Sequence, residues 1–202
     1  MGGYARYGIL NHADVNYVPL PDEIDFVEAS SMGCRYVTAF HGVFDQGHVR
    51  ADESIVVYGC GGVGLAAVQI AAAAGARVIA VDLDERKLEL AKKLGAADVV
   101  NGRKNDPVQV VMDLTHGGAD VSVDALGIAA TCRNAVASLR RRGRHVQIGL
   151  TTHSEKGEVA LPVDQIVLKD PIHRLAWDPV LPLSSGPEHD RARAPGAQET
   201  HQ

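Results

Sequence analysis

A cluster of glycines at residues 59–64 is the part of this sequence best suited to chemistry. The segment Gly59-Cys60-Gly61-Gly62-Val63-Gly64 fits the pattern G-x-G-x-x-G. It follows the apolar run 54–58, typical of a buried strand, and precedes the helix-forming residues 65–74. The first glycine of such a pattern permits a tight turn, the second lets the backbone approach a pyrophosphate, and the last lets helix and strand pack closely. Because N–H groups at the start of a helix bind phosphate oxygens, the segment predicts a dinucleotide site.

An aspartate at the end of the next apolar run bears on which dinucleotide this site would take. Asp82 stands 18 residues beyond Gly64. A carboxylate there accepts hydrogen bonds from ribose hydroxyls and repels a 2′-phosphate, which favours NAD over NADP. The alternative is a plain turn or capping residue, since Asp84 and Glu85 follow it. Its register with the glycines favours the binding role.

Two other uses of a glycine loop fit less well. Methyltransferases that bind S-adenosylmethionine usually carry an acid just before their glycines, whereas this chain has Val57 and Tyr58. A Walker A loop needs Gly-Lys-Ser/Thr, and here Leu65 follows Gly64.

The elements around these residues alternate between strand and helix, which predicts an α/β fold. The alternation indicates a doubly wound parallel sheet of the Rossmann type, covered by helices on both faces. Strands are expected at 54–58, 77–81, 98–100, 121–124 and 145–150, with helices at 65–74, 84–94, 107–114 and 129–139 between them. Residues 160–177 could add a further helix and a sixth strand.

The composition excludes several classes of protein. The chain has 202 residues, 46% of them hydrophobic, and a formal net charge of −5, so recruitment by charge to nucleic acid or anionic lipid is not favoured. No apolar run approaches the ~20 residues of a membrane span. The N-terminus lacks the apolar core of a secretory signal, and the three cysteines fit a reducing cytoplasm better than a disulfide scaffold.

The two ends of the chain follow other patterns. Residues 1–22 contain two β-like runs, 4–10 and 15–20, and a helix is expected to begin at Asp25. Five of the nine prolines lie within residues 171–202, and beyond Trp177 the sequence indicates disorder.

Several motifs, in this order and spacing, resemble the zinc-type, medium-chain alcohol dehydrogenases over residues 2–170. They are Gly33-Cys34-Arg35-Tyr36-Val37-Thr38, the glycine segment, Val81-Asp82 with Lys87, Leu94-Gly95-Ala96 and Val123-Asp124-Ala125-Leu126-Gly127. The resemblance implies an NAD-dependent oxidoreductase that interconverts a small alcohol and its aldehyde or ketone. In that family a zinc ion polarises the alcohol oxygen, and hydride passes to the nicotinamide.

The resemblance also implies roles for individual residues. Cys34 matches the last catalytic zinc ligand, and Thr38 matches a position that lines the nicotinamide side. Lys87 matches the basic residue that helps to hold the adenosine ribose. Further cofactor contacts are implied for the ends of two strands, at Ala125, Leu126, Gly127, Ile148 and Gly149. Members of the family form homo-oligomers by pairing through the outer strand of this sheet. The resemblance leaves open whether this chain does the same.

The chain departs from the family at both ends. The other catalytic zinc ligands of the family lie upstream of the equivalent of Gly2, and no four-cysteine structural zinc lobe is present. We therefore expect a remnant of a GroES-like β-barrel catalytic domain with a connecting helix (1–53), an NAD-binding domain (54–170) and an irregular tail (171–202) of out-of-frame or annotation origin. Two alternatives to an active enzyme remain: a catalytically incomplete NAD-binding module, and an unstable fragment.

Overall fold

Six parallel strands form one sheet in the order β3-β2-β1-β4-β5-β6. The computed structural model describes residues 8–9, 12–151, 156–169 and 172–175. The strands are β1 (Ser54–Tyr58), β2 (Arg77–Asp82), β3 (Asp98–Asn101), β4 (Ala119–Asp124), β5 (Leu139–Gln147) and β6 (Ile172–Leu175). This strand order is that of the doubly wound dinucleotide-binding fold, with the switch point between β1 and β4. The predicted fold class is confirmed.

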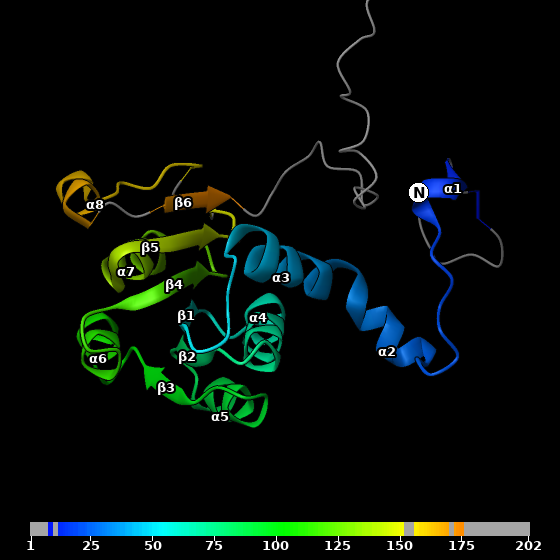
Figure 1. Cartoon of the computed structure of the whole chain (residues 1–202), viewed down its shortest axis with the longest axis horizontal. Helices are drawn as coiled ribbons and strands as arrows, with labels where there is room; N and C mark the ends of the chain where they lie inside the picture. Colours follow the sequence, from blue (N-terminus) through cyan, green and yellow to red (C-terminus); the bar gives the residue numbers. More distant parts are fainter. Residues whose placement is uncertain (1–7, 10–11, 152–155, 170–171, 176–202) are drawn as a thin grey trace, which may run out of the picture. The chain divides into compact units, whose positions relative to one another are not determined.

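Helices cover both faces of this sheet (Figure 1). One face carries α3 (Val37–Phe40), α4 (Gly62–Ala73) and α5 (Glu85–Lys93), whose apolar residues share a core with those of β1 and β2. The other face carries α6 (Pro107–Leu114) and α7 (Ala129–Ala137). A last helix, α8 (Val163–Lys169), lies next to β5.

The strands at the centre are apolar on both faces, as the sequence predicts for a covered parallel sheet. In β1 the side chains of Ile55 and Val57 enter one core cluster and those of Val56 and Tyr58 the other. All four are buried. The tight packing of β1 fixes the position of the glycine segment that follows it.

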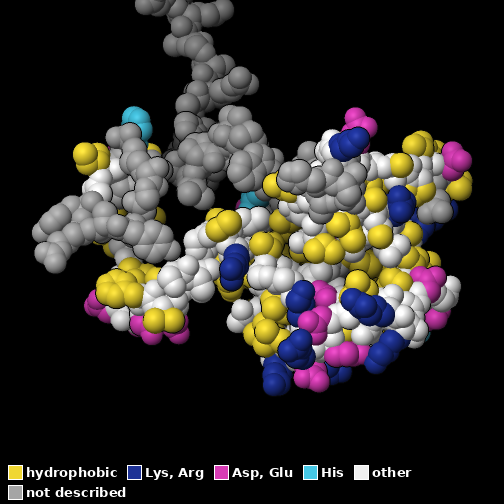
Figure 2. Space-filling model, turned by 180° about the vertical axis from the view of Figure 1, so that it is seen from behind, with side chains coloured by type: hydrophobic (Ala, Val, Ile, Leu, Met, Phe, Trp, Pro, Cys, Tyr) yellow, Lys and Arg dark blue, Asp and Glu magenta, His cyan; other side chains and the backbone are white. Residues whose placement is uncertain are grey.

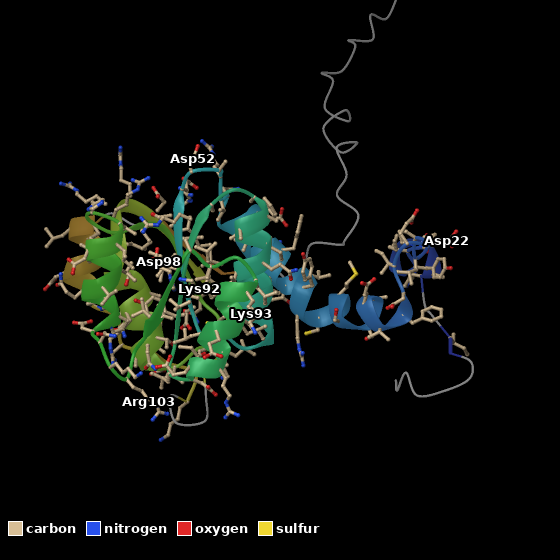
Figure 3. All side chains as sticks on the ribbon, turned by 90° about the horizontal axis from the view of Figure 1, so that it is seen from below. Asp22, Asp52, Lys92, Lys93, Asp98 and Arg103 are labelled. Atoms are coloured by element: carbon tan, nitrogen blue, oxygen red, sulfur yellow. The ribbon has the colours of Figure 1, made fainter. Side chains whose placement is uncertain are left out.

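The sheet has one edge where its parallel strands begin and an opposite edge where they end, and Figure 3 labels residues at both. Asp52 precedes β1 at the edge where strands begin, and Arg103 follows β3 at the edge where strands end. The glycine segment follows β1 and therefore lies at the carboxyl edge, where ligands of such sheets bind. Seen from behind the view of Figure 1, the surface has charged side chains of both signs interspersed with apolar ones (Figure 2).

A helical segment over residues 26–46 precedes β1 and packs against α4. It begins with α2 (Phe26–Ser31), capped by Asp25 as expected, and continues through η1 (Met32–Tyr36), α3 and η2 (His41–Gln46). Both η elements are π-helical, which widens the turn locally. The chain divides into compact units between Ile24 and Asp25, so this helical segment belongs to the same unit as the sheet. The domain boundary expected after residue 53, between the catalytic-domain remnant and the NAD-binding domain, stays a prediction.

The structure corrects two expectations for the ends of the chain. The run 15–20 is not a strand: Val15 lies in the short helix α1 (Ala13–Asn16), and residues 17–20 have no regular structure. Most of the run 4–10 and residues 176–202 lie outside the described residues. The barrel remnant is thus not confirmed. Helix α8 and strand β6 are the helix and sixth strand expected within residues 160–177, and β6 extends the sheet into the range 171–202 that was expected to be irregular. In the parts described, no helix is long and apolar enough to cross a membrane.

Candidate dinucleotide-binding site

The glycine segment joins β1 to α4 in the geometry that the sequence predicts. Gly59 has a φ of +93°, and its N–H donates to the carbonyl of Val81 at 2.8 Å. A Cβ on Gly64 would lie 1.8 Å from the carbonyl oxygen of Gly59. Only glycine at this position lets helix α4 approach strand β1 so closely. These two glycines are therefore required by the fold itself.

Gly61 differs from these two because nothing in the described chain requires it. Its φ of −79° suits any residue, and a Cβ built there meets no atom within 4 Å. Gly61 is the N-cap of α4 and no side chain caps this helix. The N–H groups of the first turn, at Gly62 and Val63, are therefore available to an anionic group.

Asp82 lies beside this turn and is fixed by backbone donors. Its Oδ2 accepts from the N–H of Cys60 at 2.7 Å, and its Oδ1 accepts from those of Leu83 and Asp84 at 2.7 and 3.0 Å. The side chain is 11% exposed. A carboxylate offers about four acceptor positions, so one position, on Oδ2, remains for a ribose hydroxyl.

Lys87 stands next to the same carboxylate, as the resemblance implies. Its Nζ lies 3.9 Å from Oδ2 of Asp82, and its side chain is half-exposed. The nearby thiol of Cys60 is buried among apolar residues, and burial together with the negative charge of Asp82 raises its pKa to about 12. Cys60 is therefore a packing residue, whereas Asp82 and Lys87 present polar atoms to solvent at the edge of the sheet.

The ends of β4 and β5 complete this edge and contain the other predicted contacts. The N–H groups of Ile148 and Gly149 donate to the carbonyl of Asp124 at 3.0 and 2.8 Å. A Cβ on Gly127 or Gly149 would collide with the backbone of the other loop. A Cβ on Gly59 would lie 3.2 Å from that of Leu126, while Ala125 flanks Gly64. The structure thus brings the glycine segment and both predicted loops together.

The carboxylate of Asp124 organises these loops, a role that the sequence reasoning did not assign. It is fully buried. Oδ1 accepts from the N–H groups of Leu126 and Gly127 and from Thr131 Oγ1, and Oδ2 accepts from Gln147 Nε2 at 3.0 Å. The sequence does contain a signal for this role, because Asp124 ends an apolar strand and is followed three residues later by Gly127. No sequence pattern pointed to its partners Thr131 and Gln147.

Cys34 and Thr38 lie on the helical segment before β1. Cys34 is exposed, and its carbonyl accepts from Thr38 Oγ1 at 2.6 Å. The described residues contain no group of three His, Cys, Asp or Glu side chains that could hold a metal ion. His41, the nearest histidine in sequence, pairs instead with Asp45 at 2.8 Å. The described residues do not supply the three ligands of a catalytic zinc, and the role of Cys34 stays a prediction.

Comparison with known proteins agrees with this geometry. Residues 62–172 match the family model described as zinc-binding dehydrogenase. An alcohol dehydrogenase of Geobacillus stearothermophilus is 38% identical over 168 residues, which cover 83% of this chain and 47% of that protein. An alcohol dehydrogenase of Rhizobium meliloti gives the same identity and coverage. The chain thus spans about half the length of the curated relatives it matches.

Solved structures show the same likeness. The alcohol dehydrogenase TADH of Thermus sp. ATN1 superposes with a TM-score of 0.74 at 32% identity, covering 81% of this chain and 46% of that one. Benzyl alcohol dehydrogenase of Acinetobacter calcoaceticus gives a TM-score of 0.75 at 28% identity, covering 80% and 44%. The chain therefore belongs to the zinc-binding dehydrogenase family, among the zinc-type, medium-chain alcohol dehydrogenases.

Proposed function

We propose that this chain binds NAD at the carboxyl edge of its sheet, as the cofactor half of an enzyme that interconverts a small alcohol and its aldehyde or ketone. The observation that carries the proposal is the open space over Gly61. Every other glycine of the pattern has a neighbour that a Cβ would meet, whereas Gly61 has none within 4 Å. Glycine is also accepted at helix N-caps, and close approach of a ligand to the backbone gives a further physical reason for glycine there.

The residues around that space fit the parts of a dinucleotide. The uncapped first turn of α4 would hold the pyrophosphate, and Asp82 with Lys87 would hold the adenosine ribose. The loops at Ala125–Gly127 and Ile148–Gly149 would place the nicotinamide half, with Thr38 on its other side. When bound, NAD supplies the acceptor or donor of hydride. The contribution of this chain is to bind and orient that group.

Zinc is implied by the family, but the described residues do not fit it. Cys34 is an exposed thiol, and among the residues that the structure describes no second and third ligand are gathered beside it. Asp82 favours NAD over NADP, because a 2′-phosphate would meet its carboxylate. All three cysteines are free, which suits a reducing compartment, and we place the protein in the cytoplasm. We include in this proposal that copies of the protein assemble into a homo-oligomer.

A second candidate is an NAD-binding module without turnover of its own. The incomplete ligand set at Cys34 favours this candidate for the chain taken alone. In both candidates the dinucleotide site is the same, and they differ in whether alcohol is oxidised.

Thermal unfolding with NAD⁺, NADP⁺ and zinc, followed by an assay for alcohol-dependent NADH, tests both candidates. Ligand at a hundredfold excess over Kd should stabilise a folded site by about 2.7 kcal/mol. Stabilisation by NAD⁺ without NADH formation supports the module, and NADH formation with stoichiometric zinc supports the enzyme. Equal stabilisation by NADP⁺ would contradict the role of Asp82. If no dinucleotide stabilises the chain, the proposal fails.

A further inference from the structure

Arg35 crosses from the helical segment before β1 to the first turn of α4. A Cβ on Gly62 would lie 2.5 Å from Cδ, 2.9 Å from Nε and 3.2 Å from Cζ of Arg35. The side chain therefore rests on the backbone of Gly62, and its guanidinium stands beside the uncapped N–H groups of this turn. Glycine at position 62 leaves the room that Arg35 occupies.

The guanidinium has no anionic partner within the described residues. The side chain of Arg35 takes part in no ion pair or hydrogen bond there, whereas those of Arg77, Arg140 and Arg144 each pair with a carboxylate. The side chain is exposed, so it is not held in place by burial. A cation and a set of uncapped backbone donors thus lie at one place, and no carboxylate of the described residues pairs with that cation.

The backbone on which Arg35 stands supports this placement. Arg35 lies within the π-helical η1, whose widened turn is stabilised by the bond from Thr38 Oγ1 to the carbonyl of Cys34. The same segment packs against α4 through the core residues Ala39 and Val43, both fully buried. The position of Arg35 over Gly62 is therefore set by a packed helix and not by a loop.

We propose that Arg35 is a phosphate-binding residue of the pyrophosphate site, placed beside the N–H groups of the first turn of α4. The inference rests on the proposed function, because it takes the dinucleotide as the ligand. A pyrophosphate diester carries two negative charges, and backbone N–H groups alone neutralise neither. A guanidinium binds phosphate oxygens through two parallel N–H donors, so it adds both charge and orientation.

The test compares ligands that share the adenosine part and differ in phosphate. The full-length chain and its Arg35→Gln, Arg35→Lys and Arg50→Gln variants are titrated with ADP-ribose by calorimetry and with adenosine by NMR. Arg50 is exposed and precedes β1, at the opposite edge of the sheet, so it controls for the change in charge. Arg35→Gln should weaken ADP-ribose binding roughly tenfold to hundredfold, as expected for loss of a charged hydrogen bond.

The remaining outcomes separate the inference from the proposed function. Arg35→Lys should lose less than Arg35→Gln, Arg50→Gln should bind as wild type, and adenosine should bind all variants alike. Raising the salt concentration should weaken ADP-ribose binding more in wild type than in Arg35→Gln. Equal ADP-ribose affinity in Arg35→Gln and wild type, or an equal loss for adenosine, overturns the inference alone. A wild-type chain that binds neither ADP-ribose nor NAD⁺ overturns the proposed function and the inference with it.

Discussion

The carboxylate of Asp82 accepts a 2.7 Å hydrogen bond from the backbone N–H of Cys60, so the end of β2 holds the glycine turn that follows β1. The residue expected to select the dinucleotide therefore also fixes the loop that would bind its phosphates. A substitution at Asp82 should change the conformation of the turn as well as the chemistry at the ribose.

Asp82→Ala should lower the free energy of unfolding by about 2 kcal/mol. The N–H of Cys60 would lose its acceptor in a part-buried site, and an unsatisfied buried donor costs roughly 1–3 kcal/mol. Urea unfolding measures the change, with Glu89→Ala on the exposed face of α5 as the control for charge. The same variant should bind NADP⁺ and NAD⁺ with more nearly equal affinity. Unchanged preference would show that selection lies elsewhere.

Gly64→Ala should mainly lower the stability of the fold, whereas Gly61→Ala should mainly lower the affinity for the ligand. A Cβ at position 64 would lie 1.8 Å from a backbone oxygen, so backbone must move, at a cost of about 3 kcal/mol or more. At position 61 the added methyl group meets no described atom, and unfolding should change by less than about 1 kcal/mol. Gly61→Ala should nevertheless weaken NAD⁺ binding in calorimetry. A variant at position 61 that binds as wild type would refute the pyrophosphate assignment.

Asp124→Ala should destabilise the chain by about 3 kcal/mol, since it removes a buried acceptor from two N–H groups, a hydroxyl and an amide. The two loops at the ends of β4 and β5 would lose their common anchor, and NAD⁺ affinity should fall with stability. Asp113→Ala, on the exposed surface of α6, is the control. Loss of affinity without loss of stability would mean that Asp124 contacts the ligand directly.

The sheet was predictable because its signals are local. Apolar runs such as 54–58 and 77–81, separated by helix formers, were enough to predict most strands and their parallel direction, and the glycine pattern located the turn, whereas the strand expected at 145–150 begins earlier, at Leu139. The run 15–20 is as apolar as a strand, but the described residues offer it no sheet to join, and Val15 lies in a helix. Local propensity without a partner strand does not make a strand.

The parts of the site that the sequence did not reveal depend on contacts between distant residues. Arg35 precedes Gly62 by 27 positions, and no spacing rule joins an arginine on one helix to a glycine on another. Gln147 reaches Asp124 across neighbouring strands in the same way. Such pairings appear only when the packing of helix on sheet is known.

The stability of the chain should fall steeply above pH 9, because three buried acids with raised pKa values, the thiols of Cys60 and Cys132 and the phenol of Tyr58, must ionise on unfolding. Burial raises the pKa of Cys60 from 9.0 to about 12 and that of Tyr58, which shares a 2.6 Å hydrogen bond with Ser138, from 10.0 to about 12. Both folded pKa values exceed the unfolded ones, so the unfolded state loses protons first. Their contribution to stability is complete below pH 9 and disappears as pH approaches 12.

Urea unfolding between pH 8 and pH 11 measures this loss. Each group contributes a slope of up to about 1.4 kcal/mol per pH unit, so the two buried thiols, Cys60 and Cys132, act from about pH 9 and Tyr58 joins them above about pH 10. Cys60→Ala and Cys132→Ala should each reduce the slope between pH 9 and pH 10 and the double variant should remove it, whereas Cys34→Ala, at an exposed thiol, should leave it in place. Tyr58→Phe with Ser138→Ala should reduce the slope above pH 10 without leaving a buried hydroxyl unpaired. If stability stays constant between pH 9 and pH 10 in the wild type, the thiol of Cys60 reaches solvent and does not belong to the core beneath the glycine turn.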